Sequence, residues 1–146
     1  MDTRAQPDGS HPPPPLSAAT AERLRDVRLR LLDLHKALLE DSRTAYELDR
    51  GRIPTTATLL QLVINDPWFA WLRPLSETVV RIDVMLLPDA EATEADAVTL
   101  LEQVERLLSP AEGVEPFAER YSEALQRQPA VIMAHADVRR VLKQVK

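Results

Sequence analysis

Residues 17–51, SAATAERLRDVRLRLLDLHKALLEDSRTAYELDRG, decide the fold of this chain. No proline or glycine interrupts residues 18–50, Ser17 has the side chain of a helix N-cap, and Gly51 stands where a helix commonly ends. The stretch predicts one helix about 50 Å long. A domain of this size has a radius of gyration of only about 14 Å. We therefore expect the helix to span the molecule, to bend, or to project toward a partner.

One face of this helix is apolar. Its members recur at helical spacing and are Leu24, Val27, Leu31, Leu34, Leu38 and Ala45. Four polar residues lie on or beside the same face, each seven residues from the next, so they form one row along the helix. They are Arg28, His35, Ser42 and Asp49, with Tyr46 close by. Such a row either pairs with neighbouring helices inside a bundle or lines a ligand pocket.

Prolines and capping residues divide the rest of the chain into further helices. Asp66-Pro67 has the pattern of an N-cap followed by proline at the first helical position, and Thr93 to Asp96 has the spacing of a capping box. These later helices are expected over residues 56–64, 67–87, 93–109, 116–128 and 130–146. The sequence therefore predicts an all-α fold, an antiparallel bundle of five to six helices with a Pro-kinked central helix.

The helix expected over residues 67–87 carries two apolar stripes. The first stripe consists of Trp68, Trp71, Leu72, Leu75, Val79, Ile82 and Leu86, and the second of Phe69, Val80, Val84 and Leu87. A helix that is apolar nearly all round is usually buried at the centre of a protein. Asp83 falls between the stripes and is predicted to be a buried carboxylate. A buried charge needs a partner, and we expect Arg28 or His35 to supply it.

Composition excludes several classes of protein. The 146 residues fit one domain, and the absence of cysteine rules out disulfides, thiolate nucleophiles and cysteine-ligated metals. A net charge of −5 argues against nucleic acid as a partner. With no apolar run long enough for a membrane span and no signal peptide, we expect a cytoplasmic location. Residues 1–16, which contain Pro12 to Pro15, are predicted to be a disordered tail before a domain at 17–146.

The sequence contains no recognisable metal, cofactor or catalytic motif. Three histidines are present, and neither His35 nor His135 follows a glutamate at the spacing used by ferritin-like di-metal sites. Phosphate-binding loops and nucleophile elbows are also missing. Both histidines fall on core-facing sides, where a haem ligand is conceivable but a hydrogen-bonded core imidazole is the commoner case. We therefore predict no metal, no cofactor and no catalytic residue.

The densest feature is residues 65–76, NDPWFAWLRPLS, which hold half of the six aromatic residues. Tryptophan and arginine are enriched in binding hot spots. Asp66, Trp68, Trp71 and Arg73 are therefore candidates for an interface or for the wall of a small pocket. The alternative is a capped, kinked helix start whose tryptophans fill one end of the bundle.

This segment also carries a resemblance. Residues 59–83, together with HKALLE at 35–40 and HADVRR at 135–140, resemble an uncharacterised family of small bacterial proteins. The resemblance covers most of residues 22–142. It implies a bacterial origin and an all-helical fold, and it implies no activity, cofactor or catalytic residue.

Three functions remain open at this level. The first is a non-enzymatic helical module that binds another protein or a second copy of itself. The second is a sensory or small-molecule-binding bundle, in which the row from Arg28 to Asp49 faces a pocket for a small apolar or anionic ligand beside Trp68 and Trp71. The third is an enzyme that uses Arg28 and His35 on an anionic substrate, in which case His35→Ala removes turnover without unfolding the protein.

Overall fold

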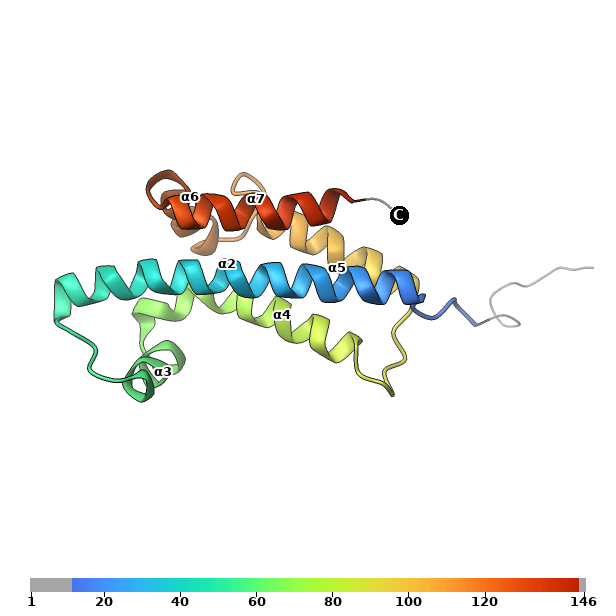
Figure 1. The fold of residues 1–146 in the computed structure, drawn as a ribbon, viewed down its shortest axis with the longest axis horizontal. Helices are drawn as coiled ribbons and strands as arrows, with labels where there is room; N and C mark the ends of the chain where they lie inside the picture. The colour runs from blue at the N-terminus through green and yellow to red at the C-terminus, as the bar shows by residue number, and fades with distance from the viewer. Residues whose placement is uncertain (1–11, 145–146) are drawn as a thin grey trace, which may run out of the picture.

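The computed structural model describes residues 12–144, and this part of the chain is all-α, as predicted. No strand occurs among these residues; the one β-bridge joins Pro15 to Thr93. Six α-helices and one 3-10 helix follow each other within residues 12–144, and Figure 1 shows their arrangement. They are α2 (Ala18–Arg50), α3 (Thr56–Asn65), η1 (Pro67–Leu72), α4 (Arg73–Met85), α5 (Glu94–Leu107), α6 (Phe117–Arg127) and α7 (Pro129–Lys143).

Helix α2 is the axis of the molecule, and its predicted limits are confirmed. The Ser17 hydroxyl accepts the Thr20 backbone N–H at 3.0 Å and so caps the first turn. At the other end Gly51 has φ 99°, a conformation that glycine adopts without strain, and its N–H bonds to the Glu47 carbonyl. The helix spans the length of the molecule (Figure 1).

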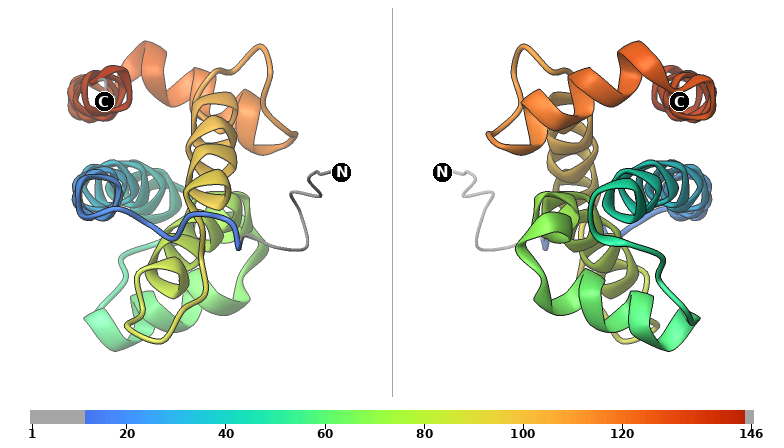
Figure 2. Two further views of the ribbon diagram at one scale, coloured as in Figure 1. Left: turned by 90° about the vertical axis from the view of Figure 1, so that its right-hand side faces the viewer. Right: turned by 90° about the vertical axis from the view of Figure 1, so that its left-hand side faces the viewer.

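The remaining helices pack around α2. Helices α7 and α4 lie alongside it and run antiparallel to it (Figure 1). Viewed along α2, α7 lies over it while α5 and α6 stand beside the pair (Figure 2). The core between them contains the predicted stripe of α2, with Leu24, Val27 and Leu31 all fully buried. None of the helices within residues 12–144 is long and apolar enough to cross a membrane.

The predicted Pro-kinked helix is two elements. The Asp66 carboxylate accepts the Trp68 backbone N–H at 2.8 Å and starts η1 with Pro67 in its first turn. Helix α4 begins at Arg73, and Pro74 occupies its first turn, where a missing N–H costs nothing. It ends at Met85, two residues before the predicted limit, and η1 winds as a 3-10 helix where an α-helix was expected.

Residues 12–17 contact the start of α5. The Pro14 carbonyl accepts the Glu94 N–H at 3.0 Å, and the Glu94 carboxylate accepts the Ser17 N–H at 2.6 Å and the Thr20 hydroxyl at 2.7 Å. The hydrogen bonds from Ser17 and Thr20, that from the Ser17 backbone most of all, lower the pKa of Glu94. Pro14 and Pro15, which belong to the predicted disordered tail, are thus placed beside the start of α5, while residues 1–11 of that tail lie outside the described residues.

The predicted capping box of α5 is confirmed. The Thr93 side chain accepts the Asp96 N–H at 3.1 Å, and the Asp96 carboxylate accepts the Thr93 N–H at 3.0 Å. Helix α7 begins at Pro129 and ends at Lys143, before the predicted end at residue 146, and residues 145–146 lie outside the described residues.

Candidate functional site

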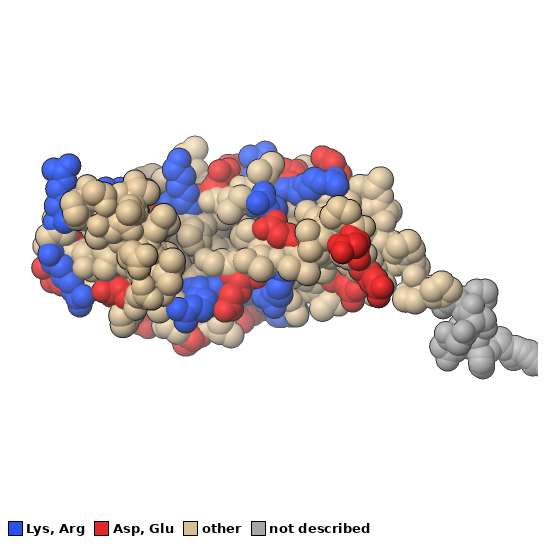
Figure 3. Space-filling model, turned by 90° about the horizontal axis from the view of Figure 1, so that it is seen from below, with Lys and Arg blue, Asp and Glu red and all other residues tan. Residues whose placement is uncertain are grey.

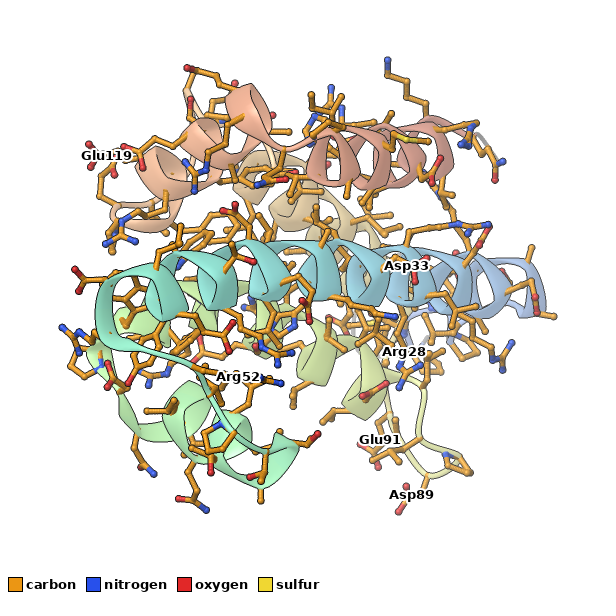
Figure 4. The ribbon with its side chains drawn as sticks, turned by 60° about the vertical axis from the view of Figure 1, so that its left-hand side comes forward. Arg28, Asp33, Arg52, Asp89, Glu91 and Glu119 are labelled. Carbon is orange, nitrogen blue, oxygen red and sulfur yellow. The ribbon has the colours of Figure 1, made fainter. Side chains whose placement is uncertain are left out.

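The polar row of α2 is paired within the protein. The Arg28 guanidinium bonds to the Asp83 carboxylate of α4, toward which it projects (Figure 4). Two turns further along α2, His35 Nε2 lies 3.1 Å from the hydroxyl of Ser76, which is also on α4. Ser42 is buried, and Asp49 is exposed beside Arg50, with 3.5 Å between their charged groups. Three of the four side chains therefore face α4 and η1, and the fourth faces solvent.

Asp83 has the partner that the sequence suggested, and its predicted burial is wrong. Its side chain is 46% exposed, and that of Arg28 is 34% exposed. Val80 and Val84 of α4, and Leu87 just after its end, are between 52% and 56% exposed. The prediction that the central helix is buried on nearly all sides is therefore also wrong. Of the predicted second stripe, Phe69 of η1 is buried, whereas Val80, Val84 and Leu87 are left about half exposed.

The two tryptophans anchor η1 to α2. The Trp71 indole N–H donates to the Ser42 hydroxyl at 3.2 Å, and the Trp68 indole N–H donates to the Ser42 carbonyl at 3.1 Å. Both indole N–H groups therefore donate their hydrogen bond to the same residue of α2, Ser42. Trp71 is buried and Trp68 is partly exposed. This arrangement corresponds to the kinked helix start that fills one end of the bundle.

Tyr46, Trp68 and Arg50 form a small aromatic cluster at the end of α2. The two rings meet edge to face with centroids 5.6 Å apart. The Arg50 guanidinium lies over both rings, 5.6 Å from the centroid of Tyr46 and 5.3 Å from that of Trp68. It also lies 3.9 Å from the Asp66 carboxylate. Sequence reasoning missed Arg50, although its position one turn after Tyr46 was a usable signal.

The two core-facing histidines pair with different elements. His35 faces Ser76 of α4, and burial lowers its pKa. His135 of α7 meets the hydroxyl of Tyr121 of α6, with 2.5 Å between that oxygen and Nδ1. Burial and then the positive charge of Arg139 lower the pKa of His135, and burial raises that of Tyr121. Among residues 12–144 no group of three or more His, Asp or Glu side chains is arranged to hold a metal ion.

A cavity of about 310 Å³ lies between α3, η1 and α4. Its walls include Val63, Ile64, Phe69 and Leu72, together with the polar groups of Arg73 and Ser76. Arg73 was a candidate from the sequence, and the structure places its exposed side chain here. Because Ser76 also contacts His35, the cavity adjoins the polar row of α2 through that hydroxyl.

A groove of about 550 Å³ with a largely apolar lining lies between α4 and α5. We call it the α4–α5 groove. Its apolar lining is formed by Val80, Val84, Met85, Leu87, Ala90, Ala92 and Leu100, and its polar lining by Arg81, Glu91, Asp96, Thr99 and Gln103. Glu91 stands on the loop that follows α4 (Figure 4). None of these residues was a candidate from the sequence, because the exposed stripe of α4 had been interpreted as core.

Comparison with protein-family models, curated proteins and solved structures finds no match for this chain. The geometry of the molecule therefore carries the functional argument. The resemblance to small bacterial proteins stays a prediction.

Proposed function

We propose that this chain is a protein-interaction module that binds an amphipathic helix of a protein partner in the α4–α5 groove. The observation that carries the proposal is the exposure of Val80 and Val84 on α4 and of Leu87 just beyond the end of that helix. Val80 and Val84 are four residues apart, so they lie on the same side of α4, where another helix can pack.

The composition of the groove suits a helix. Burying an aliphatic side chain completely contributes about 1.5–3 kcal/mol, so covering three that are half exposed contributes roughly half of that for each. Charged and polar groups, Arg81, Glu91 and Asp96 among them, border the apolar lining. An apolar centre with a polar rim is the usual anatomy of an interface, and a groove between two helices commonly accepts a third.

The contacts of the polar row of α2 support an enzyme less well than they support an interaction module. Arg28 and His35, the residues that an anionic substrate would need, bond to Asp83 and Ser76 of the same chain. Binding a partner helix in the α4–α5 groove does not require Arg28 or His35 to leave Asp83 or Ser76. We therefore favour an interaction module over an enzyme.

The test uses fluorescein-labelled synthetic helices with leucine at i, i+3, i+4 and i+7 and either basic or acidic polar faces. We expect one of the two peptide classes to bind with a rise in fluorescence anisotropy. Val84→Asp should abolish this binding, because it places a carboxylate in the apolar lining. Val98→Asp is the matched control, since Val98 of α5 is equally exposed, at 53%, and does not line the groove. Equal loss in both variants, or no binding of either class, would overturn the proposal.

A second candidate function is the binding of a small apolar anion in the cavity between α3, η1 and α4. The observation that favours it is a cavity with aliphatic and aromatic walls, one arginine, Arg73, and the hydroxyl of Ser76. Isothermal titration with octanoate tests it. We expect Arg73→Ala to abolish binding while Arg81→Ala, at the separate α4–α5 groove, leaves it intact. Absence of octanoate binding to the unmodified chain, or equal loss in both variants, contradicts this candidate.

A further inference from the structure

We propose that the partner helix of the α4–α5 groove is α3 of a second copy of this chain, in a reciprocal two-fold dimer. This inference rests on the proposed function, because it names the occupant of the same groove. Each chain would contribute its α3 and receive that of the other.

Helix α3 differs from the other α-helices within residues 12–144, because none of its ten residues is buried. Its inner side, with Leu59, Leu62 and Val63, packs partly buried against the core. Its outer side presents Leu60, which is 55% exposed, and Ile64, which is 64% exposed, with Ala57 exposed in line with them. The spacing i, i+3, i+7 is that of a helix whose anchors enter a groove.

The surface of α3 is uncharged. Its sequence, TATLLQLVIN, contains no acidic or basic residue, and the underside of the molecule shows a region without Lys, Arg, Asp or Glu where α3 lies (Figure 3). Covering a charge removes it from water at a high cost. Burying α3 against an apolar lining carries no such cost.

The charges at the edges of the two surfaces are complementary. Exposed Arg52 precedes α3, and exposed Arg73 shares a cavity with Ile64 of that helix. The edge of the groove carries two exposed acids, Glu91 and Asp96, and one exposed base, Arg81. None of these side chains belongs to an ion pair between residues that the structure describes. The acids outnumber the base, so the arginines beside α3 favour this pairing when they meet Glu91 and Asp96.

The positions of the two surfaces permit a closed dimer. Helix α3 follows the C-terminal end of α2, whereas α5 begins where Glu94 binds Ser17 at the N-terminal end of α2 (Figure 1). In a two-fold dimer, a surface that contacts a different surface of the partner does so twice. An axis that passes between α3 and the groove exchanges them and satisfies both surfaces in both chains.

Sedimentation velocity and light scattering on the unmodified chain test the proposal, and we expect a dimer. Leu60→Asp on α3 and Val84→Asp in the groove should each raise the dissociation constant at least about 30-fold, as expected for central interface residues. Val98→Asp should leave it unchanged, and circular dichroism checks that all variants remain helical. A monomer at every concentration, or a dimer indifferent to Leu60→Asp, would overturn the proposal.

Mixing the two disabled variants gives a sharper test. The Leu60→Asp chain keeps an intact groove, and the Val84→Asp chain keeps an intact α3. A dimer of one chain of each kind therefore has one undamaged contact between α3 and the groove. Native mass spectrometry should detect the mixed dimer at concentrations where neither variant dimerises alone. A symmetric contact of α4 with α4, in contrast, would yield no mixed dimer, and this result contradicts the reciprocal arrangement.

The synthetic helices separate this inference from the proposed function. They are added to Leu60→Asp chains, whose groove is intact and free of a second α3. If they bind in a Val84-dependent manner while the unmodified chain is a monomer, the inference about the second copy fails and the proposed function stands. If they do not bind and the chain is a monomer, both fail.

Discussion

Single side chains of α2 act here as connectors between helices. Ser42 is the clearest case, because its hydroxyl and its carbonyl together accept the two indole N–H groups of η1. Arg28 and His35 reach α4 in the same way. A polar residue on a core-facing side of a helix is costly unless it is bonded, and each of these three has its partner on a neighbouring element.

Ser42→Ala is expected to destabilise the protein by about 1–3 kcal/mol, because it leaves the buried Trp71 indole N–H without an acceptor. Urea denaturation followed by tryptophan fluorescence measures the change. Thr44→Ala, on an exposed position of the same helix, is the control and should change the free energy of unfolding by less than about 0.5 kcal/mol. Equal effects would show that the Ser42 hydroxyl has no special role.

Because burial lowers the pKa values of His35 and His135, we expect the protein to lose stability in mild acid. Burial lowers the pKa of His35 and of His135 in the folded protein below the ordinary value of 6.5. As the pH falls through 6.5, the unfolded chain therefore gains protons before the native chain does, and the free energy of unfolding falls. Its decline should continue until the lowered pKa values are reached. Glu94 has a lowered carboxyl pKa, so it adds to the loss only at more acidic pH.

Urea denaturation at pH 7.5 and pH 5.5 measures this dependence. The double variant His35→Gln/His135→Gln should lose less stability between the two pH values than the unmodified chain. An undiminished loss in the double variant would assign the effect to other groups.

At the scale of elements, α6 and α7 are each tied to α2 by a polar contact. The Asp41 carboxylate is 5% exposed and accepts two hydrogen bonds from Arg127 of α6, at 2.6 and 3.4 Å. The Arg23 guanidinium donates to the Leu142 carbonyl near the end of α7 at 2.6 Å. These hydrogen bonds define the positions of α6 and α7 along α2, because they require particular atoms to meet, whereas apolar contacts are not directional.

Arg127→Ala is expected to destabilise the protein by about 1–3 kcal/mol, because it leaves the buried Asp41 carboxylate without its partner. The figure stays below that of a fully buried pair because Arg127 is itself 51% exposed. Thermal unfolding of Arg127→Ala and of the control Arg120→Ala, an exposed arginine of the same helix, measures the difference. A Tm equally lowered in both would contradict a specific role for the pair.

At the scale of the whole molecule, one helix holds the others together. Helix α2 packs against α4, η1, α5, α6 and α7. The buried side chains of α2 therefore contribute to the core wherever these five elements pack against it. In such an arrangement the loss of packing on α2 weakens the entire domain, and unfolding should remain a single cooperative transition.

Leu31→Ala should lower the free energy of unfolding by about 2–5 kcal/mol, since Leu31 is fully buried and the change leaves a cavity. Leu29→Ala, two residues away and 54% exposed, should cost less than about 1 kcal/mol. Guanidinium denaturation of both variants by circular dichroism compares them. Similar losses would mean that α2 does not use the predicted face.

Local rules account for what the sequence predicted about the elements. Capping side chains at Ser17, Asp66 and Thr93 and the positions of prolines set where helices begin, because these effects involve hydrogen bonds and φ angles within a few residues. The pairing of Arg28 with Asp83 is not local, because 55 residues separate the two; the sequence offered Arg28 and His35 as alternatives, since a charge on a largely apolar face needs a partner.

The all-α class, the span of α2 and most of the residues that share a helix face follow from the sequence alone. Three features depend on the packing of the helices instead: the exposure of Val80, Val84 and Leu87, the half exposure of Asp83, and the apolar groove beside α5. Periodicity states which side chains point the same way. Whether another helix covers them depends on how all the helices pack around α2, and this is a property of the assembled chain.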